Sequence, residues 1–79
     1  MIPESRLRWR CRRGMLELDL LFNTFLDREF EGLSAAECSA LEQLLEYSDQ
    51  QLMEYLFGRT VPADEEIIPI VAKIRTAVS

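Results

Sequence analysis

Residues 15–30 read MLELDLLFNTFLDREF. Large apolar residues recur in this stretch at positions i, i+3, i+4, i+7 and i+8, namely Leu18, Leu21, Phe22, Phe25 and Leu26. Because an α-helix has about 3.6 residues per turn, this spacing places these side chains on one broad helix face. A face this wide is stable only when other elements cover it. The stretch therefore predicts the central helix of an all-α fold.

Helix signals on either side of this stretch predict its neighbours. A short, basic helix is expected over about 4–11, and Gly32 is a common type of C-terminal stop for the central helix. Residues 34–37 read SAAE, the pattern of a capping box, in which the serine and glutamate side chains each bond the other's backbone amide. This motif predicts a third helix that runs to about Tyr47 and turns three leucines inward, namely Leu41, Leu44 and Leu45.

Two more helices are expected in the C-terminal half. Ser48, or the aspartate after it, caps a fourth helix that stops at Gly58. A fifth covers about 65–78, although Pro69 fits a first turn better than a helix interior and favours a start near Ile68. Three aromatic residues around the fourth helix are expected to pack, namely Tyr47, Tyr55 and Phe57. No run alternates with period two. The prediction is a small five-helix bundle, with residues 1–79 as a single domain.

The charge of the chain is unevenly spread. Residues 1–14 carry five arginines against one glutamate, a net charge of +4, whereas residues 15–79 carry four basic and thirteen acidic residues, a net charge of −9. Glu42, Glu46 and Glu54 are expected on solvated helix faces. A basic head on an acidic body suits the orientation of a docking partner. A nucleic-acid partner is not expected, because such a protein would carry positive charge across more of its fold.

The residue types that most catalytic or metal sites need are scarce. The chain has no histidine, its three glycines stand apart, and Cys11 and Cys38 fit neither a metal spacing nor a disulfide framework. Cys11 lies among arginines that could lower its pKa, but a plain thiol is the favoured interpretation. The acidic run 64–66 is interpreted as a helix start. We therefore expect no enzyme activity, no metal and no stably bound cofactor. Free thiols favour a cytoplasmic protein, and the lack of a run of about 18 apolar residues favours one that is not membrane-inserted.

One segment has the composition of an interface. Charged and aromatic side chains crowd around Gly14, which permits a tight turn or the close approach of another backbone. Arg13 and Glu17 stand four residues apart and could pair on one helix face. Arginine and tryptophan are enriched at the energetic centres of interfaces. The candidate partner-binding residues are therefore Trp9, Arg12, Arg13, Gly14, Glu17 and Asp19.

The same segment carries a family resemblance. Arg13, Gly14 and Glu17 match an Arg-Gly-x-x-Glu motif, and the chain here resembles the succinate dehydrogenase assembly factors that promote flavin attachment. The flanking residues agree with that family at Trp9, Cys11, Arg12, Met15, Leu18 and Asp19, and so do Leu44-Leu45-Glu46, Asp49 through Leu56 and Pro62-Ala63-Asp64. The chain departs from the family pattern at Tyr55, where a tryptophan is usual. The resemblance covers essentially the whole chain.

The resemblance implies a function. It implies binding to the flavoprotein subunit of succinate dehydrogenase, and in bacteria also to that of fumarate reductase, with promotion of the covalent bond between FAD and a histidine of that subunit. The flavin and the histidine would belong to the partner. Arg13, Gly14, Glu17 and Asp19 would then form the contact surface of a factor expected to be monomeric.

Other functions remain open on the sequence. The resemblance also allows an antitoxin-like regulatory partner of a small membrane toxin, although no residue points to it. The arginine-rich head could serve as an RNA- or DNA-binding arm, which steeply salt-dependent binding would reveal. An enzyme is the least expected class.

Overall fold

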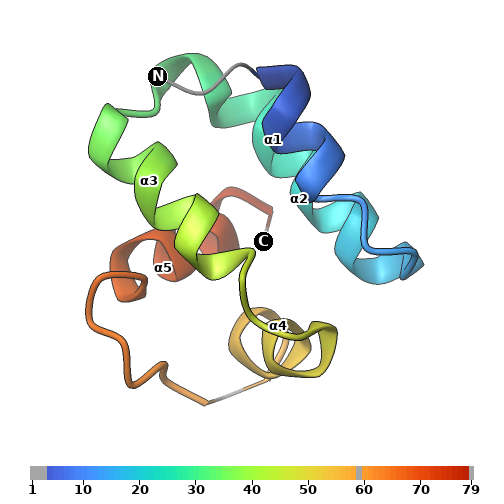
Figure 1. The fold of residues 1–79 in the computed structure, drawn as a ribbon, viewed down its shortest axis with the longest axis vertical. Helices are drawn as coiled ribbons and strands as arrows, with labels where there is room; N and C mark the ends of the chain where they lie inside the picture. The colour runs from blue at the N-terminus through green and yellow to red at the C-terminus, as the bar shows by residue number, and fades with distance from the viewer. Residues whose placement is uncertain (1–3, 59, 79) are drawn as a thin grey trace.

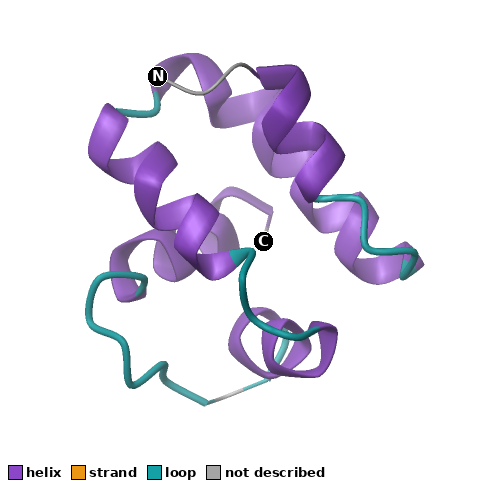
Figure 2. Ribbon diagram, in the orientation of Figure 1, coloured by secondary structure: helices purple, strands orange, loops and turns teal. Residues whose placement is uncertain are grey.

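The computed structural model describes residues 4–58 and 60–78, and these residues form five α-helices and one turn of 3-10 helix (Figure 1). In chain order the elements are α1 (Glu4–Arg10), α2 (Leu16–Glu29), η1 (Phe30–Gly32), α3 (Ala35–Leu44), α4 (Asp49–Leu56) and α5 (Ile68–Val78). Only helices and loops occur in this described part of the chain (Figure 2). The prediction of an all-α, five-helix fold is confirmed.

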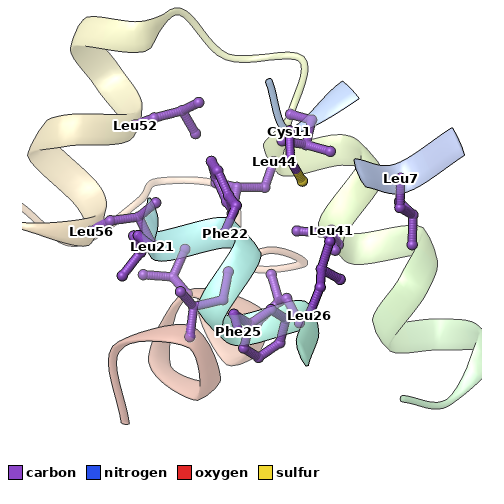
Figure 3. Close-up of a cluster of buried hydrophobic side chains, with 14 of the residues drawn as sticks. Leu7, Cys11, Leu21, Phe22, Phe25, Leu26, Leu41, Leu44, Leu52 and Leu56 are labelled. Atoms are coloured by element: carbon purple, nitrogen blue, oxygen red, sulfur yellow. The ribbon is translucent and has the colours of Figure 1, made fainter. Parts of the chain in front are cut away.

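Helix α2 lies at the centre of the packing. It contacts α1 along one side and α5 along another, and α5 also contacts α3 and α4. The apolar face predicted for α2 is buried, with Phe22 and Phe25 fully inside one hydrophobic core that draws residues from all five α-helices (Figure 3). Leu7 supplies the buried contact of α1. Because this core covers only one face of α2, the opposite face is left to solvent.

The start of α3 has the capping box that the sequence predicts. The Ser34 hydroxyl accepts a hydrogen bond from the Glu37 amide at 3.1 Å, and the Glu37 carboxylate accepts one from the Ser34 amide at 2.9 Å. The same carboxylate lies 2.9 Å from Nζ of Lys73, which ties α3 to α5. These bonds lower the pKa of Glu37, chiefly through the Ser34 amide and then through Lys73.

The predicted end of α3 differs from the observed one, whereas the favoured start of α5 and the stop of α4 at Gly58 agree with the structure. α3 ends at Leu44 rather than near Tyr47, and residues 45–47 form a turn before Ser48 caps α4. α5 begins at Ile68, so Pro69 lies in its first turn, where its missing N–H costs no helical bond. Gly58 is required after α4, because a Cβ there would lie 2.5 Å from the Glu54 carbonyl oxygen.

The aromatic residues around α4 divide between core and surface. The rings of Tyr47 and Tyr55 meet edge to face, with their centroids 5.5 Å apart. The prediction that Phe57 packs is wrong, since half of its surface is exposed. None of the helices in the described ranges is long and apolar enough to cross a membrane.

Candidate partner-binding face

The loop between α1 and α2 is built around Gly14. Its φ of 81° is a left-handed conformation that side chains rarely adopt. A Cβ built there would meet nothing within 4 Å, so within this chain the turn, and not crowding, requires glycine. The loop is also fixed by Asp19 in the first turn of α2, whose carboxylate accepts a hydrogen bond from the Arg13 amide at 2.8 Å. The tight-turn prediction for Gly14 is confirmed.

Four of the predicted site residues line one hollow on the outside of this loop. Trp9 of α1, Arg12 and Gly14 of the loop, and Asp19 of α2 form what we call the outer hollow. The Trp9 ring is 70% exposed, and the Arg12 guanidinium carbon lies 5.7 Å from its centroid, within the range of a cation–π contact. A second hollow continues past Trp9 and Arg12 to Asn23. The structure thus brings Trp9, Arg12, Gly14 and Asp19 together.

Arg13 points the other way, into the fold. Its Nε donates to the Asp49 carboxylate at 2.7 Å, and its two terminal nitrogens donate to the carbonyl oxygens of Leu45 at 3.0 Å and Tyr47 at 2.8 Å. Only 19% of its side chain is exposed. We call Arg13, Asp49 and these two carbonyl groups the Arg13 clasp. It ties the loop before α2 to the turn between α3 and α4.

The predicted pairing of Arg13 with Glu17 is wrong. Met15 is extended and α2 begins only at Leu16, so Arg13 lies outside the helix, where the four-residue spacing does not bring side chains together. Glu17 is exposed in the first turn of α2 and lines a different surface groove with Leu20, Leu21, Thr24 and Phe57.

Much of the basic head is neutralised within the fold. Arg8 forms ion pairs with Glu4 at 2.7 Å and Asp27 at 2.6 Å. Arg10 forms ion pairs with Glu42 of α3 at 3.2 Å and with Glu46, in the turn after α3, at 3.3 Å. The Glu42 side chain is only 25% exposed, so it does not lie on a solvated face as predicted, whereas the Glu46 side chain is 76% exposed. Within the described residues, Arg12 forms no ion pair and lies in the outer hollow. The outer hollow therefore offers a partner one guanidinium that forms no ion pair with the described residues.

Cys11 is a plain buried thiol. It is 2% exposed among core side chains (Figure 3), and this burial raises its pKa to about 12, although Arg13, Arg10 and Arg8 act in the opposite direction. A thiol that holds its proton at neutral pH is a poor nucleophile. Cys11 and Cys38 are both free. Within residues 4–58 and 60–78, no group of three or more His, Cys, Asp or Glu side chains is placed to hold a metal ion.

Sequence reasoning missed two features of this face. The role of Asp49 depends on the turn at residues 45–47, and the sequence alone gives no signal that this turn faces Arg13. The exposure of Leu16 and Leu20 could have been found, because both lie off the apolar stripe of α2 and are one helical turn apart.

Comparison with known proteins places the chain among related sequences. A family model described as the flavinator of succinate dehydrogenase matches residues 5–78. The FAD assembly factor SdhE of Coxiella burnetii is 38% identical, over 94% of this chain and 90% of its own length. The proteins of the same name from Legionella pneumophila (strain Paris) and Shewanella oneidensis are 43% and 41% identical, over 91% and 90% of this chain and 90% and 87% of their own. No solved structure matches significantly.

Proposed function

The chain belongs to the family of flavinators of succinate dehydrogenase, and we propose that it is an assembly factor for the flavoprotein subunit of that enzyme. It binds the subunit and promotes the covalent attachment of FAD to it. Support comes from the match over residues 5–78 and from relatives named FAD assembly factors that align over nine tenths of the chain.

The outer hollow is the observation that favours docking at this face. It combines an exposed indole, an arginine without an ion pair in the described residues, and a glycine whose lack of a side chain leaves the surface open. Tryptophan and arginine are residue types that dominate interface energies when a partner excludes water from them. In this proposal Trp9, Arg12, Gly14, Glu17 and Asp19 contact the flavoprotein. Arg13 does not contact the flavoprotein in this proposal; it holds the Gly14 loop in place.

The proposed mechanism needs no catalytic residue on this chain. The FAD, and the histidine that receives it, belong to the flavoprotein. The factor holds that subunit in a conformation in which the two groups meet, and so supplies proximity and orientation from outside. On this account the protein is not itself an enzyme and holds no FAD of its own.

Three finer points belong to the same proposal. The flavoprotein of fumarate reductase is a second client, as the family resemblance implies. The factor works as a monomer, because one hollow engages one flavoprotein. It acts in the cytoplasm, in keeping with two free thiols, which suit a reducing compartment.

The function is tested by removing the protein from its own cell. Covalent flavin on the succinate dehydrogenase flavoprotein is read as ultraviolet fluorescence of the denatured subunit in a gel. We expect the fluorescence to fall strongly without the factor and to return when the parent chain is supplied. Unchanged fluorescence in the deletion strain would contradict the proposal.

The docking face is tested with two variants at Gly14. Gly14→Ala and Gly14→Arg both put a side chain at a left-handed position, so each is expected to lose about 1–2 kcal/mol of unfolding free energy. Only the arginine also covers the outer hollow. Capture of the flavoprotein should therefore weaken with alanine and disappear with arginine. A folded Gly14→Arg variant that still co-purifies with the subunit and restores covalent flavin would refute this assignment.

A further inference from the structure

Most of the large apolar side chains that the structure leaves exposed lie near the loop of Gly14. Among the described residues these side chains are Trp9 (70% exposed), Leu16 (76%), Leu20 (63%), Phe57 (50%) and Val61 (71%). The first two flank the loop, on α1 and α2, and Leu20 follows Leu16 one helical turn later. A contiguous apolar patch with a polar rim marks an interaction site more often than chance exposure does.

Helix geometry joins these residues to the outer hollow. Successive residues of α2 are about 100° apart around its axis. On that wheel Leu16 and Leu20 lie between two flanks. One flank carries Asp19 and Asn23, which line the hollows beside Trp9 and Arg12. The other carries Glu17 and Thr24. Leu16 and Leu20 thus form a ridge on the exposed face of α2, which we call the leucine ridge. The outer hollow lies on one side of it.

A groove lies on the other side of the ridge. Glu17, Leu20, Leu21, Thr24 and Phe57 line it, and we call it the α2 groove. Phe57 comes from the C-terminal cap of α4, so the groove spans the space between α2 and α4. Its lining is mainly apolar, with the Glu17 carboxylate at one end. Glu17 forms no ion pair with any described residue.

We propose that the flavoprotein contact extends over the leucine ridge into the α2 groove, where an apolar side chain of the flavoprotein inserts beside Phe57 and an adjacent basic group meets Glu17. This inference rests on the proposed function. The occupant is assigned from continuity, because Glu17 and Leu16 belong both to the Arg-Gly-x-x-Glu motif and to this surface. It is also assigned from charge, because an unpaired carboxylate beside an apolar groove favours a segment that carries a cation next to its apolar residue. The partner segment is thereby specified as an apolar side chain next to a basic group, which the Arg-Gly-x-x-Glu motif alone does not specify.

The experiment measures the affinity of the flavoprotein, purified without covalent FAD, for three variants of the full chain. Leu20→Ser and Phe57→Ser remove apolar surface from the ridge and the groove. Val61→Ser removes a similarly exposed side chain that lines neither. We expect the dissociation constant to rise about tenfold or more for the first two, which is the effect of truncating an interface anchor, and to stay within about twofold for the third.

A fourth variant guards against loss of folding. Thr24→Phe fills the α2 groove without removing any apolar group, so it should also weaken binding while the helix content stays unchanged. Charge is tested by Glu17→Gln, which should lower the affinity and flatten its dependence on salt.

Three outcomes would overturn the inference. Binding by Leu20→Ser, Phe57→Ser and Thr24→Phe at the parent affinity, with Gly14→Arg inactive, would confine the contact to the outer hollow and leave the proposed function standing. A parent chain that forms a dimer, which Leu20→Ser converts to a monomer, would assign the groove to a second copy. Absence of flavoprotein binding by the parent chain would remove the proposed function and this inference together.

Discussion

Arg12 and Arg13 are adjacent and chemically identical, yet the fold uses them in opposite ways. The Arg12 guanidinium lies outside, over the exposed Trp9 ring, with no ion pair in the described part of the chain. Arg13 is turned inward and donates to Asp49 and to two backbone carbonyl groups. The two neighbours thus leave the loop on different sides, one toward solvent and one toward the turn between α3 and α4.

The two arginines therefore have different roles: Arg13 holds the fold together, and Arg12 is available to a partner. The Arg13 clasp joins the start of α2 to the turn before α4, and so fixes the shape of the Gly14 loop. The outer hollow, built on that loop, is left free for a partner. Arg13 can therefore act without touching the partner, because it holds the loop on which the outer hollow is built.

Removal of the clasp should have the largest effect. Arg13→Ala deletes three hydrogen bonds of a partly buried, charged group, at a cost of about 2–4 kcal/mol in unfolding free energy. That is a large fraction of the stability of a domain of this size. Denaturant titration of the parent and the variant measures the loss. A loss below 0.5 kcal/mol, the range of an ordinary surface pair, would show that the clasp does not hold the fold.

The outward arginine should have a smaller effect on the fold and a clear effect on binding. Arg12→Ala removes an exposed cation–π contact worth about 0.5–1 kcal/mol at most. Its affinity for the flavoprotein should fall about tenfold, because an interface arginine is lost. The matched control is Arg6→Ala, at an exposed arginine of α1 that does not line the outer hollow. Equal affinities for both variants would mean that positive charge in general, and not this hollow, attracts the partner.

The smallest effect is expected far from both regions, at the capping box of α3. The pKa of Glu37 is lowered by the Ser34 amide and by Lys73, so its contribution to stability is present above the ordinary pKa of a glutamate. That contribution is lost as the pH falls below the ordinary glutamate pKa and through the lowered pKa of the folded state. Thermal unfolding of Glu37→Gln against the parent should show a gap at pH 7 that closes in acid. Flavoprotein affinity at pH 7 should not change, and a change would link α3 to the docking face.

The sequence predicted the helices better than it predicted the contacts. The apolar spacing of α2 and the capping box of α3 are local patterns, and both appear as expected. Four of the predicted partner-binding residues line one hollow, and the sequence singled them out because a tryptophan, arginines and carboxylates crowd around one glycine. The direction of Arg13 could not be predicted, because it depends on the turn at residues 45–47, more than thirty positions away in the chain. The exposure of Phe57 likewise depends on where α4 ends against α2.

The central claim is that Arg13 acts through the fold and Arg12 through the partner, and Asp49→Ala tests it most directly. This variant removes the carboxylate that Arg13 Nε contacts at 2.7 Å and leaves every residue of the outer hollow in place. Gln50→Ala, in the same first turn of α4, is the control. We predict that Asp49→Ala loosens the loop and weakens flavoprotein affinity several-fold, with Gln50→Ala unchanged. If Arg13 instead contacted the flavoprotein, loss of its internal partner would free it, and an affinity equal to or higher than that of the parent would contradict the account.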